Sequence, residues 1–563
     1  MKVFRPMLFT TLKNYSKEQL IKDIVSGIIV AIIALPLSIA LALASGVGPE
    51  QGLYTAIIAG FLISFFGGST VQIAGPTAAF ATIVAGIVAT SGTSGLIVAT
   101  VMAGIILVLM GIFRFGSLIK FIPYTITTGF TAGIAVTILI GQLKDFAGIS
   151  YQNGEAPVET MEKLKAFVVN IDSINWMAVL VGAVCLGILI VWPFINKKIP
   201  GSLIAVIVGI VMVKCLKLDV NTIGDLYSIS NKLPSFALPD LSFKLIQTQL
   251  PNAFVIAVLA AIESLLSCVV ADGMVNTKHR SNTELIAQGI GNMGSALFGG
   301  IPATGAIART AANIKSGGRT PVAGMVHAGT LVLILVVLMP YAAWIPMPTI
   351  AAILFQVAYN MCQWRPFVKL CKTAPKSDIF VLVITFVLTI AFDLVVAIEF
   401  GMVVACLLFM KRMSDETDVY GWHYKEEEDV DADNNDLADV PKHIRVYEIS
   451  GPLFFGAAEV LTQIKCKDYT KCLVLRMRAV PALDITAMNA LENLLDTCQK
   501  RNIRLILSHV NAQPMHVMEK AGFVEKVGEE NLRPNIEAAL AWAAECADGI
   551  TEDNTGIKEN SLI

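Results

Sequence analysis

Two charged residues lie in stretches that are otherwise apolar or small, and both could do chemistry. Arg309 lies in FGGIPATGAIARTAANI (298–314), and Glu263 lies in AVLAAIESLLSCVVA (257–271). An arginine keeps its charge in proteins, and a charged side chain at membrane depth costs about 2.5–3.5 kcal/mol on insertion scales. A compensating group is therefore expected beside Arg309. It is either a bound anion or, in a purely structural pair, a protein carboxylate.

Glu263 is the acidic residue expected near the middle of the membrane. It lies about twelve residues into its apolar stretch, which is roughly 18 Å along a helix and near the middle of a bilayer. An ionisable residue at that depth is a functional candidate. Glu263 could carry a proton together with a transported anion, or it could be a static counter-ion for Arg309. Both roles can hold at different stages of one cycle.

Two segments far apart in the chain share one layout. FFGGSTVQIAGPTAAFATIV (65–84) and LFGGIPATGAIARTAANIKS (297–316) each contain an aromatic-Gly-Gly, a brief polar or β-prone stretch, a glycine and a short helix of small residues. They lie in the third and tenth predicted spans, which are seven spans apart. Because successive spans cross the membrane in alternate directions, an odd difference in span number gives the two segments opposite orientations. Paired interrupted segments are typical of transporter sites built by inverted repeats. The alternative is that the glycines only permit close helix packing.

A helix that begins inside the membrane directs unpaired N–H groups and a partial positive charge at the space before it. We expect Pro76 at the first helical position, with a hydroxyl from Thr77 and amides from Ala78, Ala79 and Phe80. The opposing helix would add the amides of its first residues and the charge of Arg309. The predicted ligands of a small anion are Gly75, Pro76, Thr77, Ala78, Phe80, Ala306, Ile307, Ala308 and Arg309.

Composition places most of the chain in lipid. The 563 residues are 55% hydrophobic and 15% charged, whereas soluble domains carry about 25% charged residues. The formal net charge of −2 indicates no nucleic-acid partner. The ten cysteines form no CxxC pair, so no disulfide framework, metal site or cofactor is expected. No nucleophile–base set or phosphate-binding loop indicates an enzyme.

Fourteen stretches are predicted to span the membrane as α-helices. Basic residues in the connections fall on one side under this count, which places both the N-terminus and the C-terminal region in the cytoplasm. The predicted spans are 22–44, 51–67, 75–91, 94–112, 121–142, 174–194, 200–217, 251–272, 284–299, 304–317, 321–340, 342–362, 378–392 and 394–411.

The remaining chain divides by charge and periodicity. We expect a cytoplasmic N-terminus (1–21), a transporter domain (22–412), an acidic linker (413–441), a folded domain (442–546) and a disordered tail (547–563). In the folded domain, 443–456, 471–480 and 503–510 are predicted as strands and 489–502 as an amphipathic helix. Strands that alternate with helices indicate a small α/β domain with a mainly parallel sheet.

The chain resembles the sulfate permease (SulP) family over nearly its whole length. The resemblance rests on GLYTAIIAG (52–60), GPTAAF (75–80), IESLLSCVVADGM (262–274), TKHRSNTELIAQGIGN (277–292) and GAIART (305–310), followed by a STAS domain. It implies two inverted repeats of seven spans, with a core of spans 1–4 and 8–11 and a gate of spans 5–7 and 12–14. It also implies that the core moves like an elevator and that the protein is a homodimer. The bacterial members imply that it lies in the inner membrane.

The resemblance also assigns residues. Glu263 matches the acid used for proton coupling in some bacterial members, and Arg309 matches an arginine of the chloride, sulfate and dicarboxylate branches. Ile307 stands where the sodium-dependent bicarbonate branch carries a hydroxyl, which argues against sodium. In LDITAMNAL (483–491), Ile485 replaces the phosphorylated serine of related anti-sigma-factor antagonists, and Thr486 follows it. A docking or folding role is expected for this loop, with a cytosolic partner, rather than a phosphorylation switch.

These observations favour a proton-coupled secondary transporter of C4-dicarboxylates such as succinate, fumarate and aspartate, the substrates of the bacterial members that look most similar. The alternatives are a sulfate or bicarbonate transporter or exchanger, a passive anion channel or charge-moving motor, and a membrane sensor that signals through the STAS domain. The expected partners are a small anion, protons, membrane lipid and a second copy of the chain.

Overall fold

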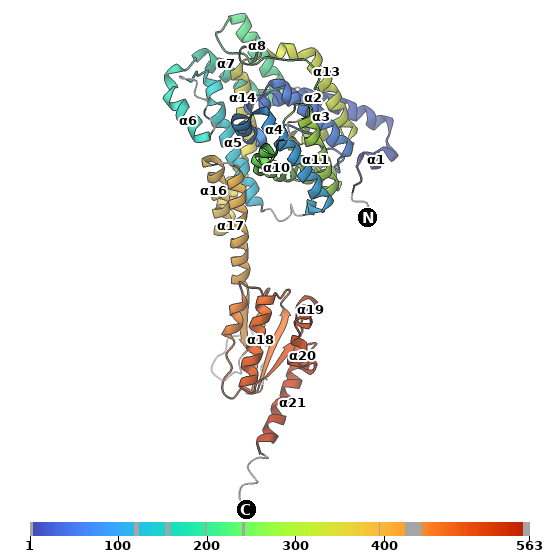
Figure 1. Cartoon of the computed structure of the whole chain (residues 1–563), viewed down its shortest axis with the longest axis vertical. Coiled ribbons are helices and arrows are strands. Elements are labelled where there is room, and N and C mark those ends of the chain that lie inside the picture. The colour runs from blue at the N-terminus through green and yellow to red at the C-terminus, as the bar shows by residue number, and fades with distance from the viewer. Residues whose placement is uncertain are drawn as a thin grey trace, which may run out of the picture. The chain divides into compact units, whose positions relative to one another are not determined.

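The computed structural model describes residues 4–117, 123–151, 157, 159–196, 200–238, 242–392, 394–422, 441 and 443–555. The chain divides into two compact units, Met1–Val403 and Val404–Ile563, and each is described by itself (Figure 1).

The first unit is almost entirely helical. Its α-helices are α1 (Leu8–Thr11), α2 (Lys17–Ala44), α3 (Pro49–Phe66), α4 (Ala81–Ile112), α5 (Tyr124–Ala147), α6 (Thr160–Val169), α7 (Trp176–Ile195), α8 (Gly201–Leu216), α9 (Ile223–Leu226), α10 (Phe243–Val275), α11 (Ser281–Leu297), α12 (Ile307–Lys315), α13 (Val322–Ala342), α14 (Met347–Cys362), α15 (Trp364–Thr373), α16 (Lys376–Ala391) and α17 (Leu394–Asp415). Short 3₁₀ helices are η1 (Leu12–Asn14), η2 (Ala78–Phe80) and η5 (Ile171–Ser173), and two short strands are β1 (Ala74–Gly75) and β2 (Thr304–Gly305).

Each predicted span overlaps one of these helices. The third and fourth spans fall on η2 and α4, and α4 is broken at Gly92, whose φ of 65° and ψ of −171° are not helical. By length and composition, six helical stretches among the described residues could cross a membrane: Lys17–Ala44, Ala78–Ile112, Tyr124–Ala147, Trp176–Ile195, Phe243–Val275 and Val322–Ala342. The predicted start of the fifth span, at 121 and 122, lies outside the described residues.

The helices of the first unit pack in two groups. In one group, α4 packs on α10 and α11, α3 packs on α11 and α13, and α2 packs on α3 and α13. In the other group, α5 packs on α14 and α16, and α7 packs on α8 and α14. All helices named in the first group belong to the expected core, and all helices named in the second belong to the expected gate.

The second unit is an α/β domain. Its elements are β3 (Asp418–Trp422), β4 (Ile444–Ser450), η6 (Ala458–Gln463), β5 (Cys472–Ala479), α18 (Ile485–Lys500), β6 (Arg504–Ser508), α19 (Ala512–Lys520), α20 (Phe523–Val527), η7 (Glu529–Asn531), β7 (Leu532–Arg533) and α21 (Ile536–Thr555). The strand order is β3-β4-β5-β6-β7. Only the β3–β4 pair is antiparallel, so the prediction of a mainly parallel sheet is confirmed.

The side chains of β5 alternate between the two faces of this sheet, as the period of two requires. Leu473 and Leu475 join a buried cluster with α18, α19 and α20. Cys472 and Val474 join a second cluster with α21. The sheet is therefore covered by helices on both faces.

Two predicted boundaries differ from the structure. The linker was predicted from 413, but α17 continues to Asp415 and β3 adds an edge strand that pairs with β4; the acidic run 425–439 lies outside the described residues. The disordered tail was predicted from 547, but α21 continues to Thr555. That prediction is wrong for 547–555, because the helix packs on the sheet through Ala543, Cys546 and Ala547 and carries on from there.

Candidate functional site

The two segments with the shared layout meet in space. Strands β1 and β2 pair antiparallel, with Ala74 opposite Gly305 and Gly75 opposite Thr304. The contact extends by one residue at the Ala74 end, because the Ala306 N–H donates to the Ile73 carbonyl at 2.9 Å and the Ile73 N–H donates to the Thr310 hydroxyl at 3.0 Å. The sheet fixes the distance between the two segments and the direction in which each continues.

A helix begins just after each strand. Thr77, with extended backbone angles, is the N-cap of η2, which leads into α4. Ala306 is the N-cap of α12, and neither cap residue accepts a hydrogen bond from an amide of its helix through its side chain. The first amides of each helix therefore have no intrahelical acceptor, and the positive end of each helix dipole lies beside the two-stranded sheet.

Arg309 lies in the first turn of α12 and is 1% exposed. Its Nη2 donates to the Pro76 carbonyl at 3.0 Å and to the Ser38 hydroxyl at 3.4 Å. Its Nε and Nη1 have no partner, and no carboxylate of the described residues forms an ion pair with it. Because a buried charge is costly without a counter-charge, this arrangement favours a bound anion over the structural pair.

Glu263 lies on α10 and contacts the residue that precedes η2. Its Oε2 accepts a hydrogen bond from the Thr77 hydroxyl at 3.0 Å. The structure therefore brings the acid to the N-cap of η2 and not to the guanidinium. The static Glu263–Arg309 pair is not observed among the residues that the structure describes.

The remaining predicted ligands separate into buried and exposed positions. Gly75, Pro76, Ala78, Phe80 and Ala306 are buried, whereas Ile307 and Ala308 are exposed at the start of α12.

Three details of the prediction are corrected. Pro76 is not the first helical residue, because Thr77 separates it from η2, and its carbonyl binds Arg309 instead. The Phe80 N–H donates to the Thr77 carbonyl at 3.3 Å. The Ala306 N–H is used by Ile73, so neither amide is a free donor. In α12 the first helical hydrogen bond runs from the Thr310 N–H to the Ala306 carbonyl. The amides of residues 307–309 precede this bond and therefore have no acceptor within the helix.

Sequence reasoning did not select two polar residues close to Arg309. Ser38 on α2 accepts from the guanidinium, and no local pattern marks it. His327 on α13 is fully buried, both of its ring nitrogens are unpartnered, and Arg309 acts on it electrostatically. A signal for His327 existed, because it is the one Asp, Glu, Lys, Arg or His between 321 and 364.

Two buried carboxylates hold the ends of the paired segments. Before β1, Glu284 accepts from the N–H groups of Gly68 at 2.8 Å and Ser69 at 3.2 Å. After α12, Asp23 accepts from the Arg319 N–H at 2.9 Å and from the Thr320 hydroxyl at 2.5 Å. Both acids therefore have a structural function, because they bind the backbone or side chains at the outer ends of the two segments.

In the second unit, Asp484 organises the loop that was expected to serve docking or folding. One carboxylate oxygen accepts from the Ala487 N–H at 2.8 Å and caps α18, and the other accepts from the Phe455 N–H at 2.8 Å. Ile485, at the position of the phosphorylated serine, is 64% exposed. Asp484 therefore has a clear folding role.

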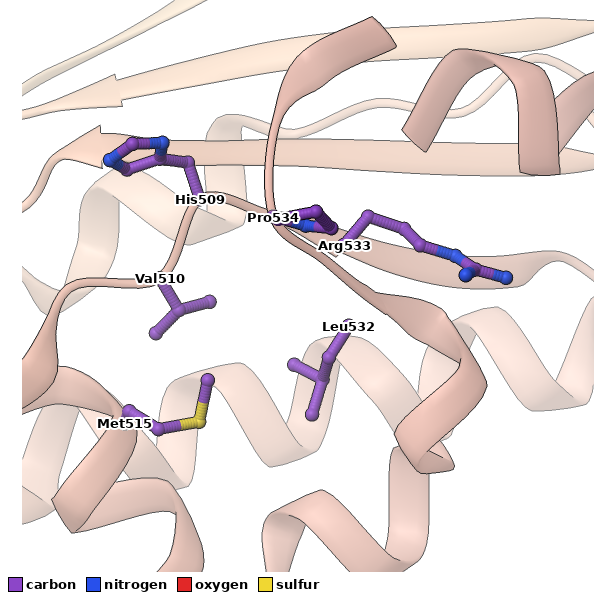
Figure 2. A pocket seen from close by; sticks show the side chains of 6 residues that line it. All are labelled: His509, Val510, Met515, Leu532, Arg533 and Pro534. Atoms are coloured by element: carbon purple, nitrogen blue, oxygen red, sulfur yellow. The ribbon is translucent and has the colours of Figure 1, made fainter. Parts of the chain in front are cut away.

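The second unit also contains a cavity of about 420 Å³. It lies at the end of β6 and β7. Figure 2 shows Val510, Met515 and Leu532 converging on it, whereas the guanidinium of Arg533 is directed away. Arg533 instead lies over the Trp542 ring, 4.4 Å from its centroid. The lining is thus mainly apolar and does not resemble the anion site at Arg309.

Comparisons with known proteins cover almost the whole chain. Residues 20–385 match the sulfate permease family, and residues 437–539 match the STAS domain. The putative sulfate transporter YvdB of Bacillus subtilis is 39% identical over 92% of this chain and 97% of its own length. The bicarbonate transporter BicA of Picosynechococcus is 30% identical over 94% of this chain and 96% of its own length.

A solved structure extends the similarity to the fold. Murine Slc26a9, an anion transporter in the inward-facing state, superposes with a TM-score of 0.87 at 18% identity and covers 96% of this chain and 94% of its own. Members of this family are transporters and not enzymes. The chain belongs to the sulfate permease family and carries a C-terminal STAS domain.

Proposed function

We propose that this chain is a secondary active transporter of small anions and that the anion binds between the starts of η2 and α12. The observation that carries the proposal is the buried guanidinium of Arg309, which keeps Nε and Nη1 free and has no carboxylate partner among the described residues. The relatives support the same reading, because one is named a putative sulfate transporter and another a bicarbonate transporter.

For the substrate we propose C4-dicarboxylates such as succinate, fumarate and aspartate. Ile307 is 42% exposed at the first position of α12, and it offers an apolar surface that a carbon skeleton can contact. The two carboxylates of such a substrate also match a guanidinium and two helix dipoles. Sulfate or bicarbonate is the second candidate, which the names of the relatives favour.

We propose protons as the coupling ion and Glu263 as the proton carrier. The carboxylate lies at the N-cap of η2 through its bond from Thr77, so it is adjacent to the proposed anion. No ion pair joins it to another of the described residues. A proton taken up there would reduce the net charge that crosses the membrane with the anion. Ile307, in place of a hydroxyl, argues against sodium.

The remaining expectations belong to the same proposal. The core would move against the gate as a rigid elevator, in a homodimer in the bacterial inner membrane, with the N-terminus and the STAS domain in the cytoplasm and a cytosolic partner at the STAS domain. A passive anion channel is the competing mechanism. Loss of concentrative uptake with intact conductance would identify it.

Uptake into proteoliposomes tests substrate and coupling together. Radiolabelled succinate, fumarate, aspartate, sulfate and bicarbonate are supplied with and without an inward pH gradient. We expect the dicarboxylates to accumulate above equilibrium only with the gradient. Accumulation of sulfate or bicarbonate alone would replace the proposed substrate, and equal accumulation without a gradient would refute proton coupling.

Two variants assign the roles. Glu263→Gln should abolish pH-driven accumulation and leave anion binding measurable, whereas Glu50→Gln, at the start of α3, is the matched control and should transport normally. Arg309→Ala removes charge-assisted hydrogen bonds worth about 1.5–3 kcal/mol, so anion affinity should fall at least tenfold. Wild-type affinity in Arg309→Ala would show that the arginine is structural, and unchanged accumulation in Glu263→Gln would exclude that acid as the carrier.

A further inference from the structure

A short helix with a basic face connects two predicted membrane spans. Helix α15 follows α14 after the single residue Gln363, and α16 begins at Lys376, soon after α15 ends. Gln363 is both the C-cap of α14 and the N-cap of α15, with φ of 43° and ψ of 44°. Because α14 and α16 fall on the twelfth and thirteenth predicted spans, α15 lies at the membrane surface between them.

One face of α15 packs on helices of the expected gate. The rings of Phe367 and Phe386, the latter on α16, have centroids 5.3 Å apart, and α15 also packs on α5. Phe367, Leu370 and Cys371 are half-buried, and they share one side of the helix because residues three and four apart are neighbours there. The orientation of α15 is therefore fixed by this packed face.

The opposite face is basic and open. Arg365, Lys369 and Lys372 recur at intervals of four and three residues, so they form one stripe, and all three are exposed. Lys376, at the start of α16, adds a fourth exposed basic side chain. None of these four residues, here called the basic surface, takes part in an ion pair of the described residues. Asp378 is the only acidic residue between 285 and 392, so the sequence nearby supplies little negative charge.

Exposed apolar side chains flank the basic surface. Trp364 is 45% exposed and Val368 is 40% exposed, and they lie one turn apart at the edge between the packed face and the basic stripe. The Trp364 indole N–H donates to the Tyr359 hydroxyl at 3.2 Å, and Tyr359 is also exposed. The Arg365 guanidinium lies over the Trp364 ring, 5.5 Å from its centroid. Trp and Tyr are enriched at the level of lipid headgroups, so this edge suits the membrane interface.

We propose that α15 is an interfacial helix whose basic surface binds the phosphate headgroups of anionic phospholipids in the cytoplasmic leaflet. Helices with Lys and Arg on the polar face and Trp, Phe or Leu on the other lie in the membrane interface. Each basic residue close to an anionic membrane strengthens binding about fivefold. This role depends on the cytoplasmic orientation proposed above and is independent of the substrate and of proton coupling. Because α15 packs on α5 and α16, bound lipids hold these two helices at the membrane surface.

The acidic run 425–439, with eight acids and one lysine, is another anionic group that could meet the basic surface. The lipid is favoured for two reasons. The connection between two spans places α15 at the membrane, and the exposed side chains of Trp364, Val368 and Tyr359 need an apolar neighbour that a highly acidic run does not offer.

Photo-cross-linking in nanodiscs tests the headgroup preference. The full-length protein is reconstituted in phosphatidylcholine with a small fraction of either photoactivatable phosphatidylglycerol or photoactivatable phosphatidylcholine, with the reactive group at the same position in both probes. The digest is analysed by mass spectrometry. We expect phosphatidylglycerol to label α15 peptides at least about fivefold more than phosphatidylcholine does, and added salt should reduce this preference. Equal labelling by the two probes would overturn the proposal.

Charge-neutral variants separate the basic surface from basic residues elsewhere. The test variant combines Arg365→Gln, Lys369→Gln, Lys372→Gln and Lys376→Gln. The matched control removes the same charge from four other exposed lysines of the first unit, by Lys13→Gln, Lys17→Gln, Lys278→Gln and Lys315→Gln. We expect the two probes to label α15 within about twofold of one another in the test variant, and the preference to persist in the control.

Three results would count against the lipid. These are an undiminished preference in the test variant, an equal loss in the control, and carbodiimide cross-links from Lys369 or Lys372 to acids of 425–439 without lipid labelling of α15. The last result would assign the basic surface to the acidic run. If the test variant fails to fold, the comparison of the two probes on the wild-type protein decides the matter.

Discussion

Gly75 is the position where the smallest change should disturb the proposed anion site. It lies in β1, and an added Cβ would overlap the Nη1 atom of Arg309, while the Cα of Ala56 lies 3.6 Å away. Nη1 is one of the two guanidinium nitrogens without a protein partner. Gly75→Ala should therefore move the guanidinium out of its place without removing any charged group.

The magnitude follows from what the guanidinium loses. It would give up its hydrogen bond to the Pro76 carbonyl, at 3.0 Å, or its hydrogen bond to the anion. A charge-assisted hydrogen bond is worth about 1.5–3 kcal/mol, which corresponds to roughly a 10- to 150-fold loss of affinity. Overpacking itself costs about 1–3 kcal/mol of stability, so the protein should still fold.

The assay is the concentration dependence of initial uptake in proteoliposomes, paired with the thermal unfolding midpoint of the same preparation. Gly86→Ala on α4 is the matched control, because no heavy atom lies within 4 Å of its added Cβ. We expect KM to rise at least tenfold in Gly75→Ala and to stay unchanged in Gly86→Ala. A folded Gly75→Ala protein with a KM within about twofold of wild type would refute the placement of Arg309 at the anion.

Two further predictions concern the scaffold. Asp484→Ala removes the N-cap of α18 and the acceptor of the Phe455 N–H, which should cost about 1–2 kcal/mol of stability. Amide hydrogen exchange at the start of α18 should become about tenfold faster in the full-length protein. The control is Asp496→Ala, at an exposed position on the same helix, which should leave that exchange rate unchanged. Glu284→Gln weakens the hydrogen bonds that the carboxylate accepts from Gly68 and Ser69; the unfolding midpoint should fall by a few degrees, and an unchanged midpoint would show that the charge is not needed there.

Much of the architecture was predictable from the sequence because its signals are local. Long apolar runs mark the helices, and alternation marks strands β4, β5 and β6. The end of the STAS domain was not predictable to the residue. The chain beyond 546 has no marked apolar face of its own, and it is helical to Thr555 because α21 packs on a sheet formed by distant strands.

The candidate site was predictable in its residue types and less so in its bonding. The layout shared by 65–84 and 297–316 correctly indicated that the two segments belong together, and strands β1 and β2 join them. Which donors remain free could not be read from either segment. The amide of Ala306 is used by Ile73, that of Phe80 is used by Thr77, and the Pro76 carbonyl binds Arg309.

Hydropathy and charge are properties of the residues in order, so the amino-acid sequence alone indicates that this chain lies mostly in lipid and that Arg309 needs a compensating group. The folded structure was needed to show that Glu263 meets Thr77, that Ser38 and Pro76 bind one nitrogen of the guanidinium, and that its two other nitrogens have no protein partner. Those outcomes depend on distances between α2, η2, α10 and α12, and such distances are fixed by packing between segments that no local pattern connects.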